Sequence, residues 1–163
     1  ELLAELEKNF HVTVVTQNID NLHERAGSSH IIHLHGELTK VCSSRDPHNP
    51  HYIKELKPEE YEVKMGDKAG DGTQLRPFIV WFGEAVPEIE TAIQYVEKAD
   101  IFVIIGTSLN VYPAAGLLHY VPRGAEVYLI DPKPVDTHTS RSIHVIQKGA
   151  SEGMGELKQL LGV

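Results

Sequence analysis

Residues 16–20, with the sequence TQNID, place four polar side chains directly after HVTVV, an apolar run with the composition of a buried strand. A loop that only turns the chain can do so with a glycine, a proline or one aspartate. Amide, hydroxyl and carboxylate groups in this number either cap a helix and a turn or point at a ligand.

His35 is a second candidate for chemistry. It lies in the LHG step at the end of another strand candidate, HIIHLHG, and the glycine that follows leaves the ring uncrowded. An imidazole titrates near neutral pH, which suits a general base acting on a hydroxyl. A structural histidine that bonds to the backbone explains this stretch equally well.

Two further strand candidates also end in polar clusters: GTS follows IFVII, and IDP follows VYL. Each cluster alone is better explained as a turn. Ligands of open parallel sheets bind beyond the carboxyl ends of the strands, so three clusters on separate strands indicate one shared crevice. Gly106, Thr107 and Ser108 could contact a phosphate, although these 163 residues contain neither GxGxxG nor GxxxxGK[ST].

The elements that must position these groups alternate between strand and helix from residue 75 onward, which predicts a parallel α/β sheet. ADIFVIIGTSL gives the strongest strand signal, and its continuous apolar run is typical of burial on both faces. Residues 39–74 are polar and rich in proline, histidine and charge. We therefore expect an irregular insert at 39–74 between two parts of one domain, 1–38 and 75–163.

Composition excludes several classes of protein. A net charge of −8 with no basic stripe argues against nucleic-acid binding, while leaving room for a basic peptide partner. No apolar stretch approaches the roughly 20 residues that span a bilayer. The single cysteine excludes an internal disulfide, and a cytoplasmic protein is expected.

The chain opens on Glu1 inside a helical pattern with no N-cap. This favours the interpretation that the sequence is a piece of a longer protein.

Ten histidines raise the question of a metal site. His33 and His35 share one face of a strand, and His48 and His51 lie near Cys42 in the sequence. Zinc sites use four ligands at regular spacings such as CxxC pairs, and the second cysteine after Cys42 is absent. We expect no metal, and no nucleophilic role for Cys42, because nothing near it in the sequence marks an activated thiol.

The run RPFIVWFGE permits two interpretations. Its aromatic residues could be ordinary core, with Trp81 buried. They could equally line a narrow apolar channel beside an open strand edge, to which an extended peptide could add as a further strand.

Taken together and in order, TQNIDNLHERAG, LHG, RPFIVWFGE, IGTSLNVYPAA, IDP and KGAS closely resemble the sirtuins, the NAD-dependent protein lysine deacylases. The resemblance implies a Rossmann-like parallel sheet with helices on both faces and a reduced small module at 39–74. It also implies that acyl groups, such as acetyl, are removed from protein lysines to give nicotinamide and O-acyl-ADP-ribose.

The resemblance assigns a role to each matching residue. It makes His35 the general base on a ribose hydroxyl, with Gln17, Asn18 and Asp20 orienting the nicotinamide ribose and Ile19 shaping its pocket. Contacts to the remainder of NAD fall to Gly106, Thr107, Ser108, Asp131, Ala150 and Ser151. The acyl-lysine substrate would be held by Val80, Phe82, Gly83, Glu84, Asn110 and Val111.

Two departures from the family pattern qualify these expectations. The Gly-Ala-Gly phosphate loop and the Asp-Phe-Arg element of the family are absent, so weak NAD binding is expected of these residues alone. Of the four zinc cysteines only Cys42 matches, which predicts a metal-free loop. Three alternatives remain: a catalytically idle NAD- or peptide-binding module, a mono-ADP-ribosyltransferase, and an unrelated NAD oxidoreductase, which the missing dinucleotide fingerprint disfavours.

Overall fold

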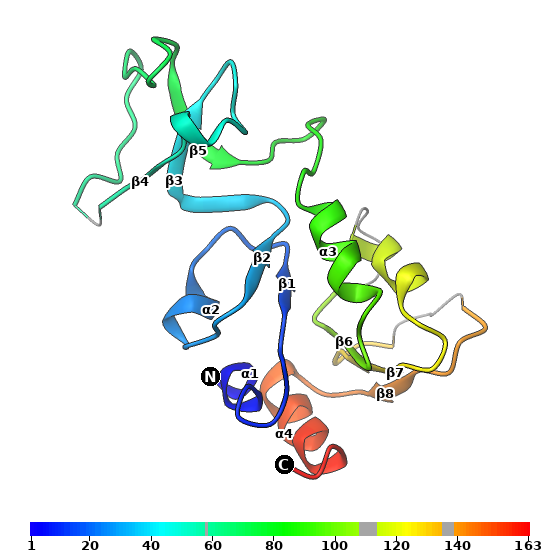
Figure 1. The fold of residues 1–163 in the computed structure, drawn as a ribbon. Coiled ribbons are helices and arrows are strands. Elements are labelled where there is room, and N and C mark those ends of the chain that lie inside the picture. The colour runs from blue at the N-terminus through cyan, green and yellow to red at the C-terminus, as the bar shows by residue number, and fades with distance from the viewer. Residues whose placement is uncertain (58, 108–113, 135–138) are drawn as a thin grey trace.

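The computed structural model describes the whole chain except residues 58, 108–113 and 135–138. Two parallel sheets and one antiparallel sheet form its framework (Figure 1). In the first parallel sheet, β1 (Val14–Thr16) pairs with β2 (Ile31–His33). In the second, β7 (Glu126–Ile130) lies between β6 (Ile101–Ile105) and β8 (His144–Ile146). The expected parallel α/β architecture is confirmed, with its described parallel strands divided between two sheets.

Helices cover both faces of the β6–β7–β8 sheet because the side chains of β7 alternate between two apolar cores. Val127 and Leu129 join one core with residues of α3 (Ile89–Val96) and η2 (Ala114–Tyr120). Tyr128 and Ile130 join the other core with residues of α1 (Leu2–Leu6) and α4 (Ala150–Leu160). The continuous apolar composition that predicted burial on both faces follows from this arrangement.

The first core also fixes the smaller parallel sheet. Ile32 of β2 packs with residues of α3, β6 and β7, and so does Leu34, the first residue after β2. A short helix, α2 (Leu22–Arg25), connects β1 to β2. Its C-cap Ala26 is followed by Gly27, which adopts a left-handed φ of +95°. The carboxyl ends of β1 and β2, which carry TQNID and LHG, therefore lie side by side at one sheet edge.

The antiparallel sheet has β3 (Gly36–Ser43) between β4 (Lys54–Glu55) and β5 (Leu75–Ile79), with a one-turn helix η1 (Pro50–Tyr52) nearby. It projects away from α1 and α4 (Figure 1). Residues 39–74 hold more regular structure than their composition indicates. The reason is that β3 continues to Ser43 by pairing with β5, a partner more than 30 residues later that no local pattern reveals.

A hydrogen-bond cluster around Ser43 holds the base of this insert. The buried Ser43 hydroxyl donates to Asp71 Oδ2 (2.6 Å), and Thr73 Oγ1 donates to Asp71 Oδ1 (2.7 Å). Ser43 Oγ also accepts the backbone N–H groups of Arg45 and Asp46, both at 3.1 Å. The bonds that Asp71 accepts from Ser43 and Thr73 lower its pKa to about 2. The insert is thus closed by side-chain hydrogen bonds beside Cys42.

Replacing Ser43 with alanine is expected to lower the free energy of unfolding by about 1–3 kcal/mol, because two backbone donors and Asp71 lose a buried partner. Thermal melting would measure the loss, with the exposed Ser44→Ala as the matched control. Equal melting temperatures for the two variants would contradict a stabilising role for the cluster.

No helix among the described residues is long and apolar enough to cross a membrane.

Candidate active site at the ends of β1 and β2

The backbone from the end of β1 into the loop after it is hydrogen-bonded to the end of β2 and to the segment after β2. Thr16 O accepts the Leu34 N–H (2.9 Å), and Ile19 O accepts the Leu38 N–H (2.8 Å). The two carbonyls between them accept from imidazoles: His35 Nδ1 contacts Gln17 O and His33 Nδ1 contacts Asn18 O, both at 3.1 Å. Four consecutive carbonyls are therefore fixed, which holds the backbone that carries the polar side chains of the loop.

The bond from His35 to Gln17 determines the tautomer of the His35 ring. A carbonyl oxygen only accepts, so Nδ1 must carry the hydrogen, and the Nε2 atom of the neutral ring then keeps its lone pair. The His35 side chain is partly buried. A neutral imidazole held this way can take a proton from a hydroxyl at Nε2, which fits the predicted base.

The side chains of the TQNID segment divide between the two predicted uses. Thr16 Oγ1 accepts the Asn18 N–H (3.1 Å), and Asp20 Oδ1 accepts the Leu22 N–H at the start of α2 (3.0 Å). By contrast, Gln17 Nε2 is buried and has no hydrogen-bond partner among the residues that the structure describes. A buried amide without a partner costs free energy, and a hydrogen bond from Gln17 Nε2 to a ligand would recover it.

His33 and Glu24 were not predicted as site residues, although the spacing of His33 and His35 gave one signal. His33 shares a strand face with His35, and the structure adds Glu24 of α2, whose Oε1 lies 2.7 Å from His33 Nε2. Glu24, His33 and Glu37 offer three ligand atoms within 4.8 Å of one another. Each already has a partner, because Glu24 pairs with His33 and Glu37 pairs with Lys40 at 2.6 Å.

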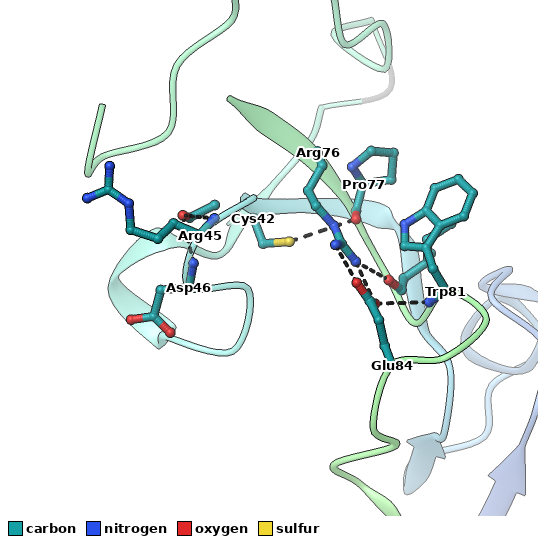
Figure 2. Close-up of polar contacts among 9 residues, drawn as sticks. Cys42, Arg45, Asp46, Arg76, Pro77, Trp81 and Glu84 are labelled. Carbon is teal, nitrogen blue, oxygen red and sulfur yellow. Dashed lines mark hydrogen bonds and ion pairs between the residues drawn. The ribbon is translucent and has the colours of Figure 1, made fainter. Parts of the chain in front are cut away.

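The WFGE segment is clamped by an arginine of β5 (Figure 2). Arg76 donates Nη1 to Glu84 Oε1 (2.7 Å) and Nη2 to Glu84 Oε2 (2.8 Å), and Nη2 also donates to Ile79 O (2.8 Å). Glu84 Oε2 accepts the Trp81 N–H as well (3.0 Å). The Glu84 carboxylate, predicted to contact a substrate, is therefore engaged within the protein and shapes the loop that would make that contact.

Trp81 and Phe82 project from this clamped loop. Trp81 is 52% exposed, so its interpretation as buried core is wrong, and Phe82 is fully exposed. Gly83 adopts a left-handed φ of +89°, which reverses the chain between these aromatic residues and Glu84. The segment thus presents two aromatic side chains on a fixed backbone.

Arg76→Gln is expected to loosen this segment, since a bidentate pair and a bond to Ile79 O are lost. Trp81 is the only tryptophan, so its fluorescence anisotropy should fall and its quenching by acrylamide should rise. The Arg76 pair lowers the pKa of Glu84 to about 2 in the folded protein, below the ordinary 4.5. The clamp should therefore be complete above pH 4.5 and be lost as the pH falls toward 2.

The matched control for this experiment is Arg123→Gln, at an exposed position in another part of the fold. If Arg76→Gln leaves the Trp81 signal the same as this control does, the clamp does not order the loop.

A cavity of about 280 Å³ lies behind this loop, between β2, β3, β5 and α3. Its walls include Val80, His33, Glu37 and Arg76. Of the described residues predicted for the site, only Val80 lines this cavity.

The predicted contacts to the rest of a nucleotide lie at the ends of other elements. Gly106, at the end of β6, has a φ of +63° and open space where a side chain would be. Asp131 directly follows β7, but its Oδ1 accepts the Lys133 N–H (2.8 Å), as a turn-forming aspartate does. Ala150 and Ser151 begin α4 after the N-cap Gly149. Thr107 follows Gly106, whereas Ser108, Asn110 and Val111 lie outside the described residues.

Cys42 is fully buried in β3, and its Sγ contacts Pro77 O at 3.8 Å. Burial raises the pKa of its thiol. A buried thiol with a raised pKa has little thiolate at neutral pH, which agrees with the prediction that Cys42 is not a nucleophile.

Comparisons with known proteins show the family to which this chain is similar. A sequence model of the Sir2 family matches residues 1–113. An NAD-dependent protein deacylase of Bacteroides thetaiotaomicron is 93% identical over 161 residues, which are 99% of this chain and 69% of that protein. An NAD-dependent protein deacylase of Helicobacter pylori is 48% identical over 155 residues, which are 95% of this chain and 65% of that protein.

Solved structures give the same result. A Sir2 homologue in complex with NAD superposes with a TM-score of 0.79 at 34% identity, over 99% of this chain and 62% of that one. A Sir2 complex with p53 peptide and NAD+ gives a TM-score of 0.76 at 29% identity, over 99% of this chain and 68% of that one. The chain therefore spans roughly two thirds of the length of these relatives.

Proposed function

The chain belongs to the Sir2 family, and from this premise we propose that the protein removes acyl groups from lysine side chains of other proteins in a reaction that consumes NAD. In the balanced reaction, NAD, acyl-lysine and water give nicotinamide, free lysine and O-acyl-ADP-ribose. The acyl group is thus transferred from lysine nitrogen to a ribose oxygen, and nicotinamide leaves. The observation that carries the proposal is His35, whose tautomer the Gln17 carbonyl fixes.

The residues at the ends of β1 and β2 fit NAD. Gln17 offers a buried amide nitrogen that has no hydrogen-bond partner among the described residues, and the exposed Asn18 lies beside it on a fixed backbone. We assign Gln17, Asn18, Ile19 and Asp20 to the nicotinamide ribose. When bound, NAD supplies a glycosidic bond whose nicotinamide is a good leaving group.

Other elements would hold the rest of the dinucleotide. Gly106 lets a phosphate approach the backbone closely, because nothing occupies the space beside its Cα. The 11-residue helix α4 begins at Ala150, where backbone N–H groups and the helix dipole favour polar or anionic groups. We assign Gly106, Thr107 and Ser108 to the phosphates and adenosine ribose, Asp131 to ribose hydroxyls, and Ala150 and Ser151 to the adenine edge.

His35 carries the proton transfer. With Nδ1–H donated to Gln17 O, the lone pair on Nε2 can accept the proton of a ribose hydroxyl, so that the oxygen can take the acyl group. The hydrogen bond to Gln17 also stabilises the ring orientation while the charge forms. Positioning and proton transfer are thus joined in one side chain.

The clamped WFGE loop would receive the substrate. Its fixed backbone and exposed aromatic side chains suit an extended peptide that adds along the loop, with Val80 and Phe82 beside the acyl-lysine. Gly83 and Glu84 would border the peptide on this side, and Asn110 and Val111 on the other. We infer that no metal takes part, because Ser43 and Asp71 close the insert by hydrogen bonds.

The test uses the protein at its full natural length with NAD and peptides that carry acetyl-, succinyl- or longer acyl-lysine. Mass spectrometry should detect nicotinamide, the deacylated peptide and O-acyl-ADP-ribose together. A peptide or protein that gains the mass of ADP-ribose would favour the transferase alternative. Absence of nicotinamide release with every peptide would contradict the proposal and favour an idle binding module.

A further inference from the structure

Two histidines of the same strand segment hold neighbouring carbonyls but differ in their second nitrogen. His35 and His33 both donate Nδ1–H, to Gln17 O and Asn18 O respectively. The Nε2 atom of His33, however, lies 2.7 Å from a carboxylate oxygen of Glu24. The same strand face therefore carries two imidazoles with different hydrogen-bonding requirements.

With Glu24 ionised, these contacts place a proton on both ring nitrogens of His33. The Asn18 carbonyl can only accept, and an ionised Glu24 carboxylate also can only accept. A ring that donates at both positions is an imidazolium, and here it forms an ion pair with Glu24. His33 is 8% exposed, so this charge-assisted pair is shielded from water on the imidazole side. His33 is thereby excluded as a base, whereas His35 keeps its lone pair.

The charged groups around His33 support the cationic form. Glu24 faces it from α2, and Glu37 faces it from β3 while pairing with Lys40. Burial of the ring lowers the pKa of His33. The bonds to Glu24 and Asn18 O and the charges of the two carboxylates together raise the pKa by more than burial lowers it, so the net pKa is raised from 6.5. Burial raises the pKa of Glu24 and the bond from His33 lowers it, with a net value below 4.5.

We propose that His33, held as an imidazolium by Glu24, is a positioning residue that fixes the Asn18 peptide and so orients the Gln17 and Asn18 side chains for NAD. This inference rests on the proposed function, because it assigns NAD to the loop. Of the four fixed carbonyls, Asn18 O is one of two that a side chain holds, and Glu24 and His33 link it to α2. Loss of either partner frees the loop at the residue next to Gln17.

The proposal has a pH dependence with a defined sign. Because the pKa of His33 is raised in the folded protein, the stabilisation of the positioned loop by the His33 cation is complete below pH 6.5. This stabilisation is lost as the pH rises through the folded-state pKa. The Glu24 contribution is complete above pH 4.5. NAD should therefore bind most tightly between these limits and more weakly at higher pH.

The experiment measures the dissociation constant of NAD by titration calorimetry from pH 5.5 to 9, without peptide, on the full natural chain. His33→Gln cannot serve Glu24 and Asn18 O together and carries no charge, and we expect it to bind NAD roughly ten-fold more weakly at pH 6. Glu24→Gln keeps the shape of a half-exposed side chain, so the protein should fold. As the pH rises, the Glu24→Gln variant should begin to lose NAD affinity at a lower pH than the wild type does.

The control is His51→Gln, at an exposed position of η1, and melting temperatures verify that each variant is folded. His33→Gln should also lack the loss of NAD affinity at high pH that the wild type shows. If the wild type binds and consumes NAD but both variants bind it as tightly as the control at every pH, the positioning role is overturned and the proposed function stands. If the wild type neither binds nor consumes NAD, the proposed function itself fails.

Discussion

Replacing His35 with alanine is expected to slow deacylation by about 10³-fold, within the range that general acid–base catalysis contributes. The variant loses the Nε2 lone pair and the Nδ1–H bond to Gln17 O together. Single-turnover formation of O-acyl-ADP-ribose, followed by mass spectrometry, would measure the loss. NAD binding is expected to weaken much less than the rate falls, since three of the four carbonyl bonds remain.

His119→Ala provides the matched control, because His119 is exposed on η2. It should keep the wild-type rate. If His35→Ala keeps more than about a tenth of that rate, His35 is a structural histidine and the base lies elsewhere.

Gly36→Ala is expected to lower the free energy of unfolding by about 3 kcal/mol, the sum of a left-handed backbone cost and overpacking. Gly36 has a φ of +78°, and an added Cβ would lie 2.2 Å from the carbonyl oxygen of Phe78 and 3.0 Å from the Cα of Ile79. Both obstacles are backbone atoms of the paired strand β5, so the clash is relieved only by moving β3 away from β5.

Urea denaturation would measure this loss, with Gly124→Ala as the control because nothing lies within 4 Å of its added Cβ. Since Gly36 directly follows His35, the displaced strand should also lower the deacylation rate of any folded fraction. Equal stabilities for the two variants would contradict the close approach of β3 and β5.

The reason for the glycine after His35 illustrates what the sequence could not reveal. LHG indicates an uncrowded imidazole, but the structure gives a different cause: Gly36 begins β3 opposite Ile79 in a space that no side chain could occupy. A pairing between residues more than 40 positions apart is set by tertiary packing. The motif drew attention to this glycine, and the physical reason for the glycine lies in the fold.

Much of the architecture was nevertheless predictable. Alternation of apolar strands and amphipathic helices indicated the parallel α/β fold, because burial on both faces of β6 and β7 demands continuous apolar runs. The order of the quoted motifs predicted the Sir2 family, which the comparisons confirm. The individual site roles of His35, Gln17 and Gly106 remain predictions that the experiments above address.

The sequence by itself determined which residue types could do the chemistry and on which strand ends they stand, because strand periodicity is local. Only the tertiary structure decided how those groups are used. It engaged Glu84 with Arg76, gave Asp20 to the start of α2, and left Gln17 Nε2 without a partner among the described residues. It also distinguished the two histidines of one strand face: Glu24 pairs with His33, whereas no carboxylate in the described part of the chain pairs with His35. Hydrogen-bond partners come from segments distant in the chain, so the protonation state of an imidazole is a property of the fold.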